Sequence, residues 1–230
     1  GANGSGKSTL LNAIAGTVVI DSGKITIDDV DVTALKDFER SRWISRIFQN
    51  PLMGTSPELS ILENFRLASL RKKTKSLTIG TGKGFRNTTS QLISTLNLGL
   101  EKKLDQPMGT LSGGQRQALS LLMAVMDEPK ILLMDEPTAA LSASEVERLM
   151  TVMRNLRDTN KAVIFVSHRL DEVFAISDFI TVMRDGATVS EAKTTDTNLQ
   201  QVIREMVGRE LTEMFPKTEN KIGEVVLEVN

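Results

Sequence analysis

Residues 1–11, GANGSGKSTLL, carry the pattern that decides the fold. They match the phosphate-loop pattern G-x-x-x-x-G-K-S/T, in which glycines let consecutive backbone N–H groups turn toward phosphate oxygens. A helix follows such a loop, and its positive N-terminal end adds to the attraction for phosphate. The stretch therefore predicts a nucleotide site whose binding residues are Gly1, Asn3, Gly4, Ser5, Gly6, Lys7, Ser8 and Thr9.

Two side chains of this loop have a defined chemistry. Lys7 would contact the β and γ phosphates, and the Ser8 hydroxyl would ligate Mg²⁺. A plain glycine turn before a helix is the alternative, and the completeness of the pattern makes it the weaker one. We therefore expect a nucleotide and Mg²⁺ as ligands.

A pair of acidic residues follows the apolar run in ILLMDEP, residues 131–137. Asp135 would hold Mg²⁺ through its water shell, and Glu136 would act as general base toward a water molecule that attacks the γ phosphate. Two adjacent acids could also be a solvated strand end. Beside a phosphate loop, the catalytic interpretation is the stronger of the two.

A second glycine-rich helix start lies in GTLSGGQRQ, residues 109–117. Ser112 is a plausible N-cap, and Gly113 and Gly114 allow another group to approach the backbone closely. The segment has neither a lysine nor a preceding strand, so it would contact a phosphate without holding a whole nucleotide. It is therefore expected to close over a nucleotide bound by another subunit, although a plain capped helix would explain the same residues.

The remaining pattern predicts an α/β fold. A helix is expected from Lys7 to Gly16, one half-exposed strand in GKITIDDVDVT and another strand in WISRIFQN. Strand signals then disappear, and a helical subdomain is expected over about residues 57–127. Further on, helices alternate with the apolar strands ILLMD and AVIFVS, which indicates a parallel sheet covered by helices on both faces. A polar hairpin and a last helix end the domain at about residue 207, and residues 208–230 are expected to be a linker with one new strand.

Composition restricts the kind of protein. The chain has 230 residues, enough for one domain and a fragment of another, and its formal net charge of −1 gives no general attraction to nucleic acid. Cysteine is absent, which excludes disulfides and thiolate metal sites. With no apolar run long enough to cross a bilayer and no secretory segment, a cytoplasmic protein is expected, and any membrane role would require a separate partner chain. Because the chain starts inside a motif and without Met, we expect a fragment of a longer protein.

Five motifs in this order, GANGSGKST, FQNP, LSGGQ, LLMDEPT and VSHR, resemble the ATP-binding cassette (ABC) ATPases over nearly the whole chain. LSGGQ is the motif most specific to that family. The resemblance implies a P-loop NTPase fold, ATP with Mg²⁺, hydrolysis by in-line attack of water, and a head-to-tail dimer of cassettes. Gln49 would then ligate and sense magnesium and its water while coupling to a transport subunit. His168 would contact the γ phosphate.

In the dimer that the resemblance implies, residues of one cassette complete the site of the other: Ser112, Gly113, Gly114 and Gln115. His168 is the only histidine, and without the other motifs it would be a strand-end residue with a satisfied hydrogen bond. The sequence departs from the family at Ser142, where an aspartate is usual. The family also has an adenine-stacking aromatic and a central strand before the phosphate loop, so the ATPase domain over residues 1–207 is expected to lack its N-terminal strands.

The two halves of the chain resemble different branches of the family. DEPTAALSASEVERL, VSHRLDEVFAISD and MVGREL resemble the first cassette of two-cassette importers for monosaccharides and nucleosides. In that setting EVVLEVN resembles the opening strand of the second cassette. ISRIFQNPLMGTSPELSILEN and LSGGQRQALSLLMAVM instead resemble single-cassette ATPases of proposed amino-acid importers. A chimera joined near residues 131–142 is therefore an open alternative.

The resemblance implies an ATPase subunit that powers solute import through transmembrane permease subunits. It would work indirectly with a substrate-binding protein, lie peripherally on the inner face of the cell membrane, and bind no nucleic acid. One alternative is a soluble cassette ATPase of translation or DNA repair. The sequence shows no nucleic-acid-binding extension, which argues against it. Another is a fragment or chimera that has the shape of a cassette without its turnover.

Overall fold

A computed structural model describes residues 4–48, 50–70, 80–139, 141–158 and 161–208. The predicted tail, residues 208–230, thus lies outside the described residues from position 209 onward. The elements follow one another as α1 (Lys7–Ala15), β1 (Thr26–Ile27), β2 (Val30–Asp31), α2 (Asp37–Arg40), β3 (Ile44–Ile47), η1 (Pro51–Gly54), α3 (Ile61–Ala68), α4 (Lys83–Ser94), η2 (Leu100–Lys102), η3 (Met108–Thr110), α5 (Gly113–Val125), β4 (Ile131–Asp135), α6 (Ala143–Asp158), β5 (Ala162–Val166), α7 (Leu170–Ile176), β6 (Phe179–Arg184), β7 (Ala187–Lys193), η4 (Thr194–Asp196) and α8 (Leu199–Val207).

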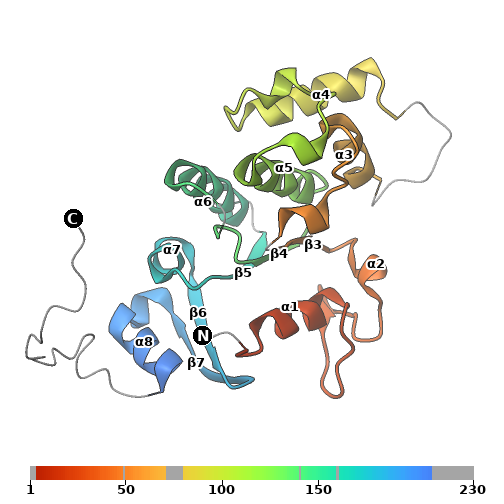
Figure 1. The fold of residues 1–230 in the computed structure, drawn as a ribbon. Coiled ribbons are helices and arrows are strands. Elements are labelled where there is room, and N and C mark those ends of the chain that lie inside the picture. Colours follow the sequence, from red (N-terminus) through yellow and green to blue (C-terminus); the bar gives the residue numbers. More distant parts are fainter. Residues whose placement is uncertain (1–3, 49, 71–79, 140, 159–160, 209–230) are drawn as a thin grey trace, which may run out of the picture.

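A three-stranded parallel sheet, in the order β3–β4–β5, forms the centre of the fold (Figure 1). In its register Met134 of β4 lies between Ile47 of β3 and Phe165 of β5, and Asp135 pairs with Val166. The three inner residues of β4, Leu132, Leu133 and Met134, are buried, as in a strand covered on both faces. The predicted parallel sheet is confirmed.

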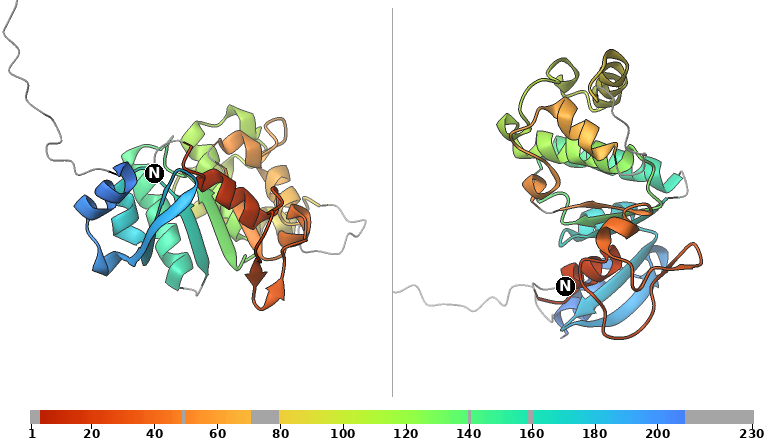
Figure 2. Two further views of the ribbon diagram at one scale, coloured as in Figure 1. Left: turned by 90° about the horizontal axis from the view of Figure 1, so that it is seen from below. Right: turned by 90° about the vertical axis from the view of Figure 1, so that its right-hand side faces the viewer.

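Helices cover both faces of this sheet. Figure 1 shows α1 on one side and α5 and α6 on the other, and the side view in Figure 2 shows the same layers. On the α1 side, Leu11 packs with Ile44 and Leu133. On the other side, Leu121 of α5 and Met150 of α6 belong to one buried cluster with residues of β3 and β4. The α/β class therefore follows from burial of strands that are apolar on both faces.

Helices α3 and α4 and the middle and second half of α5 form a separate apolar cluster. Phe65 of α3, Ile93 of α4 and Leu119 of α5 are each fully buried in it. The expected helical region after the strand WISRIFQN thus contains α3 and α4, and both pack against α5. The boundaries of a helical subdomain at about residues 57–127 stay a prediction.

One sequence prediction about the early strands was wrong. GKITIDDVDVT forms two short antiparallel strands, β1 and β2, instead of one continuous strand. Asp28 and Asp29 form the turn between them and have φ angles of 49° and 63°. Aspartate tolerates this left-handed conformation better than most residues, which permits a two-residue turn without glycine.

A polar hairpin, β6–β7, and helix α8 end the described fold, as predicted. Within the described residues, β5 and β6 belong to separate sheets, and a groove of about 350 Å³ lies between them. Its lining is mainly apolar and includes Leu10, Ile164, Val182 and Val202. The expectation of a missing strand beside the phosphate loop stays a prediction. None of the described helices is both long enough and apolar enough to cross a membrane.

Candidate functional site

The phosphate loop enters α1 through glycines in a left-handed conformation. Gly4 and Gly6 have φ angles of 85° and 87°. The backbone angle of Gly6 favours glycine, and a Cβ atom added there would make a tight contact of 3.3 Å with the Cα atom of Gly186. The Lys7 ammonium donates a hydrogen bond to the Ser5 hydroxyl at 2.7 Å. Gly1, Asn3 and also Gln49 lie outside the described residues.

A single cavity of about 430 Å³ joins this loop to the acidic pair predicted from ILLMDEP. It lies where the start of α1 faces the carboxyl end of β4. The two motifs are more than a hundred residues apart in sequence, and the tertiary structure brings them together. The cavity is lined by Gly4, Ser5, Gly6, Lys7, Ser8, Thr9, Asp135, Glu136 and Val166.

The oxygen atoms in this cavity fit a bound Mg²⁺. The Ser8 hydroxyl and the Asp135 carboxylate are hard oxygen ligands, which Mg²⁺ prefers. Among the described residues, no cluster of three or more His, Cys, Asp or Glu side chains could hold a metal by itself. A metal here would therefore take its remaining ligands from water and from nucleotide phosphates, as Mg²⁺ does at phosphate-transfer sites.

Glu136 lines the cavity, and His168, which is not among the described residues that line it, lies next to Glu136. The Glu136 carboxylate oxygen Oε1 is 3.4 Å from Nδ1 of His168, and the two side chains are 20% and 60% exposed. The Glu136 backbone N–H donates to the Val166 carbonyl at 2.9 Å. Since His168 follows β5 by two positions, the parallel pairing of β4 with β5 places both side chains at one end of the sheet. His168 is therefore not an isolated strand-end residue.

The glycine-rich start of α5 is built as a capping box. The Ser112 hydroxyl accepts a hydrogen bond from the Gln115 backbone N–H at 3.2 Å, and the Gln115 side chain accepts one from the Ser112 N–H at 3.1 Å. An added Cβ atom on Gly114 would clash with the Glu145 carboxylate, which shows that Gly114 lies directly against that carboxylate. None of residues 112–115 is among the described residues that line the phosphate cavity.

Ser142, which departs from the family pattern, is also part of a helix cap. Its backbone N–H and its hydroxyl both donate to Oε2 of Glu145, at 2.9 Å and 2.7 Å. The same carboxylate packs against Gly114 of α5. Glu145 therefore connects the loop after the acidic pair to the start of α5, a contact that sequence reasoning missed.

Arg46 is a second residue that sequence reasoning missed. It lies on β3, where its Nη1 donates to Oδ1 of Asn12 on α1 at 2.6 Å, and its guanidinium stacks 4.8 Å from the centre of the Phe48 ring. Burial lowers the pKa of Arg46, and the charge of Asp135 partly opposes that effect. A charged residue inside the strand ISRI is the signal that could have identified it.

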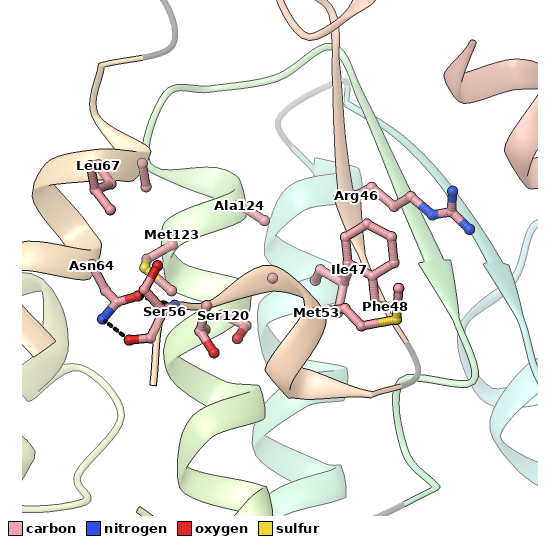
Figure 3. Close-up of a pocket in the computed structure, with 13 residues that line it drawn as sticks. Arg46, Ile47, Phe48, Met53, Ser56, Asn64, Leu67, Ser120, Met123 and Ala124 are labelled. Carbon is pink, nitrogen blue, oxygen red and sulfur yellow. Dashed lines mark hydrogen bonds between the residues drawn. The ribbon is translucent and has the colours of Figure 1, made fainter. Parts of the chain in front are cut away.

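A groove of about 400 Å³ lies between β3, η1, α3 and α5 (Figure 3). Phe48 and Met53 line one side of it, and Met53 is 69% exposed. On the other side Asn64, which is buried, accepts from the Ser56 N–H at 2.8 Å and donates to the Ser56 carbonyl at 3.0 Å. The groove is thus an open surface of mixed polarity, held in shape by hydrogen bonds.

Comparison with known sequences places these features in a family. A family model described as ABC transporter matches residues 1–139. Ribose import ATP-binding proteins of Bacillus licheniformis and of Lactococcus lactis subsp. cremoris are 38% and 37% identical to this chain over 229 and 228 residues. The matches cover 100% and 99% of this chain and 45% of each relative, so the chain spans about half the length of the curated relatives it matches.

Comparison with solved structures gives the same fold. The ATP-binding cassette MJ0796, solved as a dimer in a post-hydrolysis state bound to ADP and Pi, superposes with a TM-score of 0.73 at 28% identity, covering 84% of this chain and 82% of that chain. MJ1267, an ATP-binding cassette of an ABC transporter, gives a TM-score of 0.75 at 26% identity and covers 90% and 83%. The predicted P-loop NTPase fold is confirmed.

Proposed function

Because this chain belongs to the ABC transporter family, we propose that it binds Mg-ATP and hydrolyses it to drive solute import through separate membrane subunits. The observation that carries the proposal is the cavity of about 430 Å³ that contains both the phosphate loop and the pair Asp135 and Glu136. Phosphate-binding backbone, a lysine, a hydroxyl and two carboxylates around one space are the groups that phosphoryl transfer to water requires.

Each of these groups has one task in the proposed reaction. Lys7 neutralises charge on the β and γ phosphates, while Ser8 and Asp135 hold the metal. Mg²⁺, when bound, supplies further charge neutralisation on the phosphate oxygens. Glu136 orients the attacking water and accepts its proton, and His168, which is 3.4 Å from Glu136, contacts the γ phosphate. Gln49 contributes to the metal site and links it to the membrane partner.

We further propose that two cassettes pair head to tail. Residues 112–115 lie outside the phosphate cavity of their own chain, and α5 offers the positive end of a helix to a ligand on its exposed side. The solved cassette MJ0796 is described as dimeric. In the proposed dimer, Ser112, Gly113, Gly114 and Gln115 of one chain contact the γ phosphate held by the phosphate loop of the other.

The groove beside Phe48 is the proposed contact surface for a transmembrane permease subunit. Met53 is 69% exposed there, and Phe48 directly precedes Gln49 in the sequence. A movement of the partner in this groove would thus act close to the nucleotide site. The proposed location is peripheral, on the inner face of the cell membrane, with a substrate-binding protein acting on the permease and no nucleic acid involved.

Ribose or a related sugar is the solute class that the relatives favour. Proteins named as ribose import ATP-binding proteins align with practically the whole chain, including the stretches that resemble amino-acid importers. An amino-acid-like solute therefore has less support. A second cassette beginning within residues 208–230 is part of the same proposal, since the relatives are about twice as long as this chain.

Substitution of Glu136 by Gln tests the proposed reaction. Loss of the proton acceptor should lower the rate of phosphate release by about 10²-fold or more, while ATP stays bound and a nucleotide-containing dimer accumulates. Phosphate release and size-exclusion elution would be measured in parallel. The control Glu147→Gln alters an exposed carboxylate on α6, 70% exposed and paired only with Arg154 in the described contacts, and should leave turnover unchanged. Undiminished turnover of Glu136→Gln would remove Glu136 from the mechanism.

A further inference from the structure

Glu172 is a buried carboxylate that none of the roles above uses. It lies on α7, one turn after His168, and only 5% of it is exposed. A buried carboxylate is costly unless charged and polar partners compensate for its lost hydration. The partners of Glu172 therefore indicate what the residue does in the fold.

The two oxygens of this carboxylate have different partners, on two different loops. Oε2 accepts a hydrogen bond from the Thr138 hydroxyl at 2.7 Å, and Oε1 forms an ion pair with Nη1 of Arg169 at 2.7 Å. Thr138 is only 3% exposed and follows Glu136 by two positions, while Arg169 directly follows His168. One carboxylate thus joins the loop that carries Glu136 to the loop that carries His168.

The backbone of Glu136 shows why such a link is needed. Its φ angle is 46°, in the left-handed region that is unfavourable for a residue other than glycine. A strained conformation of this kind persists only where surrounding contacts hold it. The Glu136 N–H is bonded to the Val166 carbonyl on one side, and Thr138 is held by Glu172 on the other.

We propose that Glu172 is a positioning residue for hydrolysis: by holding Thr138 and Arg169, it keeps the Glu136 carboxylate and the His168 ring side by side over the γ phosphate. The proposal rests on the proposed function, because it concerns how the same site is held in its productive geometry. Displacement of a catalytic group by about 1 Å can lower a rate by about 100-fold, so a link outside the cavity is sufficient to control turnover.

Two substitutions test the link from its two sides. Glu172→Gln removes the charge at nearly constant size, and Thr138→Val removes the hydroxyl. Each should lower kcat by about 10-fold or more with KM and nucleotide affinity within about 2-fold of the parent, because the ATP-binding groups are untouched. Thr138→Ser keeps the hydroxyl and should retain parental kcat. The double substitution should cost no more than the worse single one, as for two partners of one interaction.

The matched control is Asp171→Asn. Asp171 is 74% exposed and contacts Arg169 at 3.8 Å, yet it does not reach Thr138 in the described contacts. It should therefore leave kcat unchanged. A general loss of stability would instead lower the melting temperature and the active fraction while leaving kcat per folded molecule at the parental value, and that result would overturn the proposal.

Hydrogen exchange supplies a readout that does not depend on turnover. The amides of Glu136, Ala139 and Leu141 are hydrogen-bonded in this loop and should exchange faster in Glu172→Gln and Thr138→Val than in the parent or in Asp171→Asn. Unchanged exchange would overturn the proposal, as would unchanged kcat. Failure of the proposed function has a different signature: no turnover by the parent, or full turnover by Glu136→Gln. Should Glu172→Gln not fold, Thr138→Val and Thr138→Ser decide the question alone.

Discussion

Two helices of this protein start at glycine-rich motifs, and their first turns differ. α1 follows Gly6 in a left-handed conformation, and among the described residues no side chain caps it. α5 follows Ser112, which forms a reciprocal cap with Gln115. The start of α1 thus offers N–H groups and Lys7 to an anion, whereas part of the α5 start is already bonded within its own chain. Glycines at a helix start therefore do not make a binding site alone; the cap and the nearby charge distinguish a site that holds a ligand from one that completes it.

Substitution of Lys7 should have the largest effect on the difference between the starts of α1 and α5. Lys7→Ala leaves the loop backbone in place but deletes the cation that is proposed to contact two phosphates, so ATP affinity should fall by about 100-fold or more. Titration with a fluorescent ATP analogue measures the change. Lys24→Ala is the matched control, since Lys24 is 64% exposed in an ion pair with Asp31, outside the cavity lining. Parental affinity of Lys7→Ala would contradict the assignment of the loop.

The next largest effect is expected on the free energy of unfolding, from a change at the C-terminal end of α1. The Arg40 guanidinium, 2% exposed, donates hydrogen bonds to the carbonyls of Ala13 and Ile14 at the end of α1, at 2.7 Å and 2.8 Å. Burial lowers the pKa of Arg40, as expected for a cation held by neutral carbonyls. Arg40→Met should reduce the free energy of unfolding by about 3 kcal/mol, since it leaves buried carbonyls unpaired.

Chemical denaturation measures this loss in stability. Arg42→Met, which alters an exposed arginine stacked 5.4 Å from the centre of the Trp43 ring, serves as the control and should have a small effect. Equal stability of the two variants would show that α1 is not held from its C-terminal end.

Substitution of Ser112, the capping residue of α5, tests whether the start of α5 is only a helix cap. Ser112→Ala should cost about 1 kcal/mol of stability through loss of the cap. If Ser112 also contacts a phosphate in a second cassette, turnover should fall by about 10-fold or more while ATP affinity of the monomer is unchanged. The control Ser60→Ala removes an equivalent cap from α3 and should lower stability without lowering turnover. Equal turnover of the two variants would make Ser112 a structural cap only.

The smallest expected effect is a pH dependence of stability that distinguishes the capping box of α3 from that of α5. The box at α3 contains Glu63, whose pKa is lowered mainly by the hydrogen bond from the Ser60 hydroxyl, whereas the box at α5 contains Gln115. A carboxyl whose pKa is lower in the folded state stabilises the fold above its unfolded pKa, near 4.5, and this contribution is lost as the pH falls through the lowered value. The stability difference between the parent and Glu63→Gln should therefore shrink below about pH 4.5. Thermal melts from pH 7 to pH 3 measure it, and a constant difference would contradict the role of the charge.

Much of the candidate site could be predicted from short stretches of sequence. The phosphate loop, the acidic pair after β4 and the cap of α5 each consist of neighbouring residues whose backbone angles and hydrogen bonds are local, so their patterns are visible without a fold. The parallel sheet was also predictable, because strands buried on both faces must be apolar throughout. The Asp28 and Asp29 turn was missed because it lacks the glycine that usually marks a two-residue hairpin.

The contacts between these stretches depend on the three-dimensional packing. Arg46 and Asn12 are 34 positions apart, and so are Thr138 and Glu172, and their side chains meet only after β3, β4 and β5 have been placed side by side. Periodicity predicts which face of a helix is buried, but it does not specify which polar group of the neighbouring element contacts that face. Residues proposed to bind phosphate are thus recognisable from their neighbours in the chain. Residues such as Glu172, which join two loops of the site, become recognisable only from the fold, because burial of a charge has a meaning only together with the partner that compensates it.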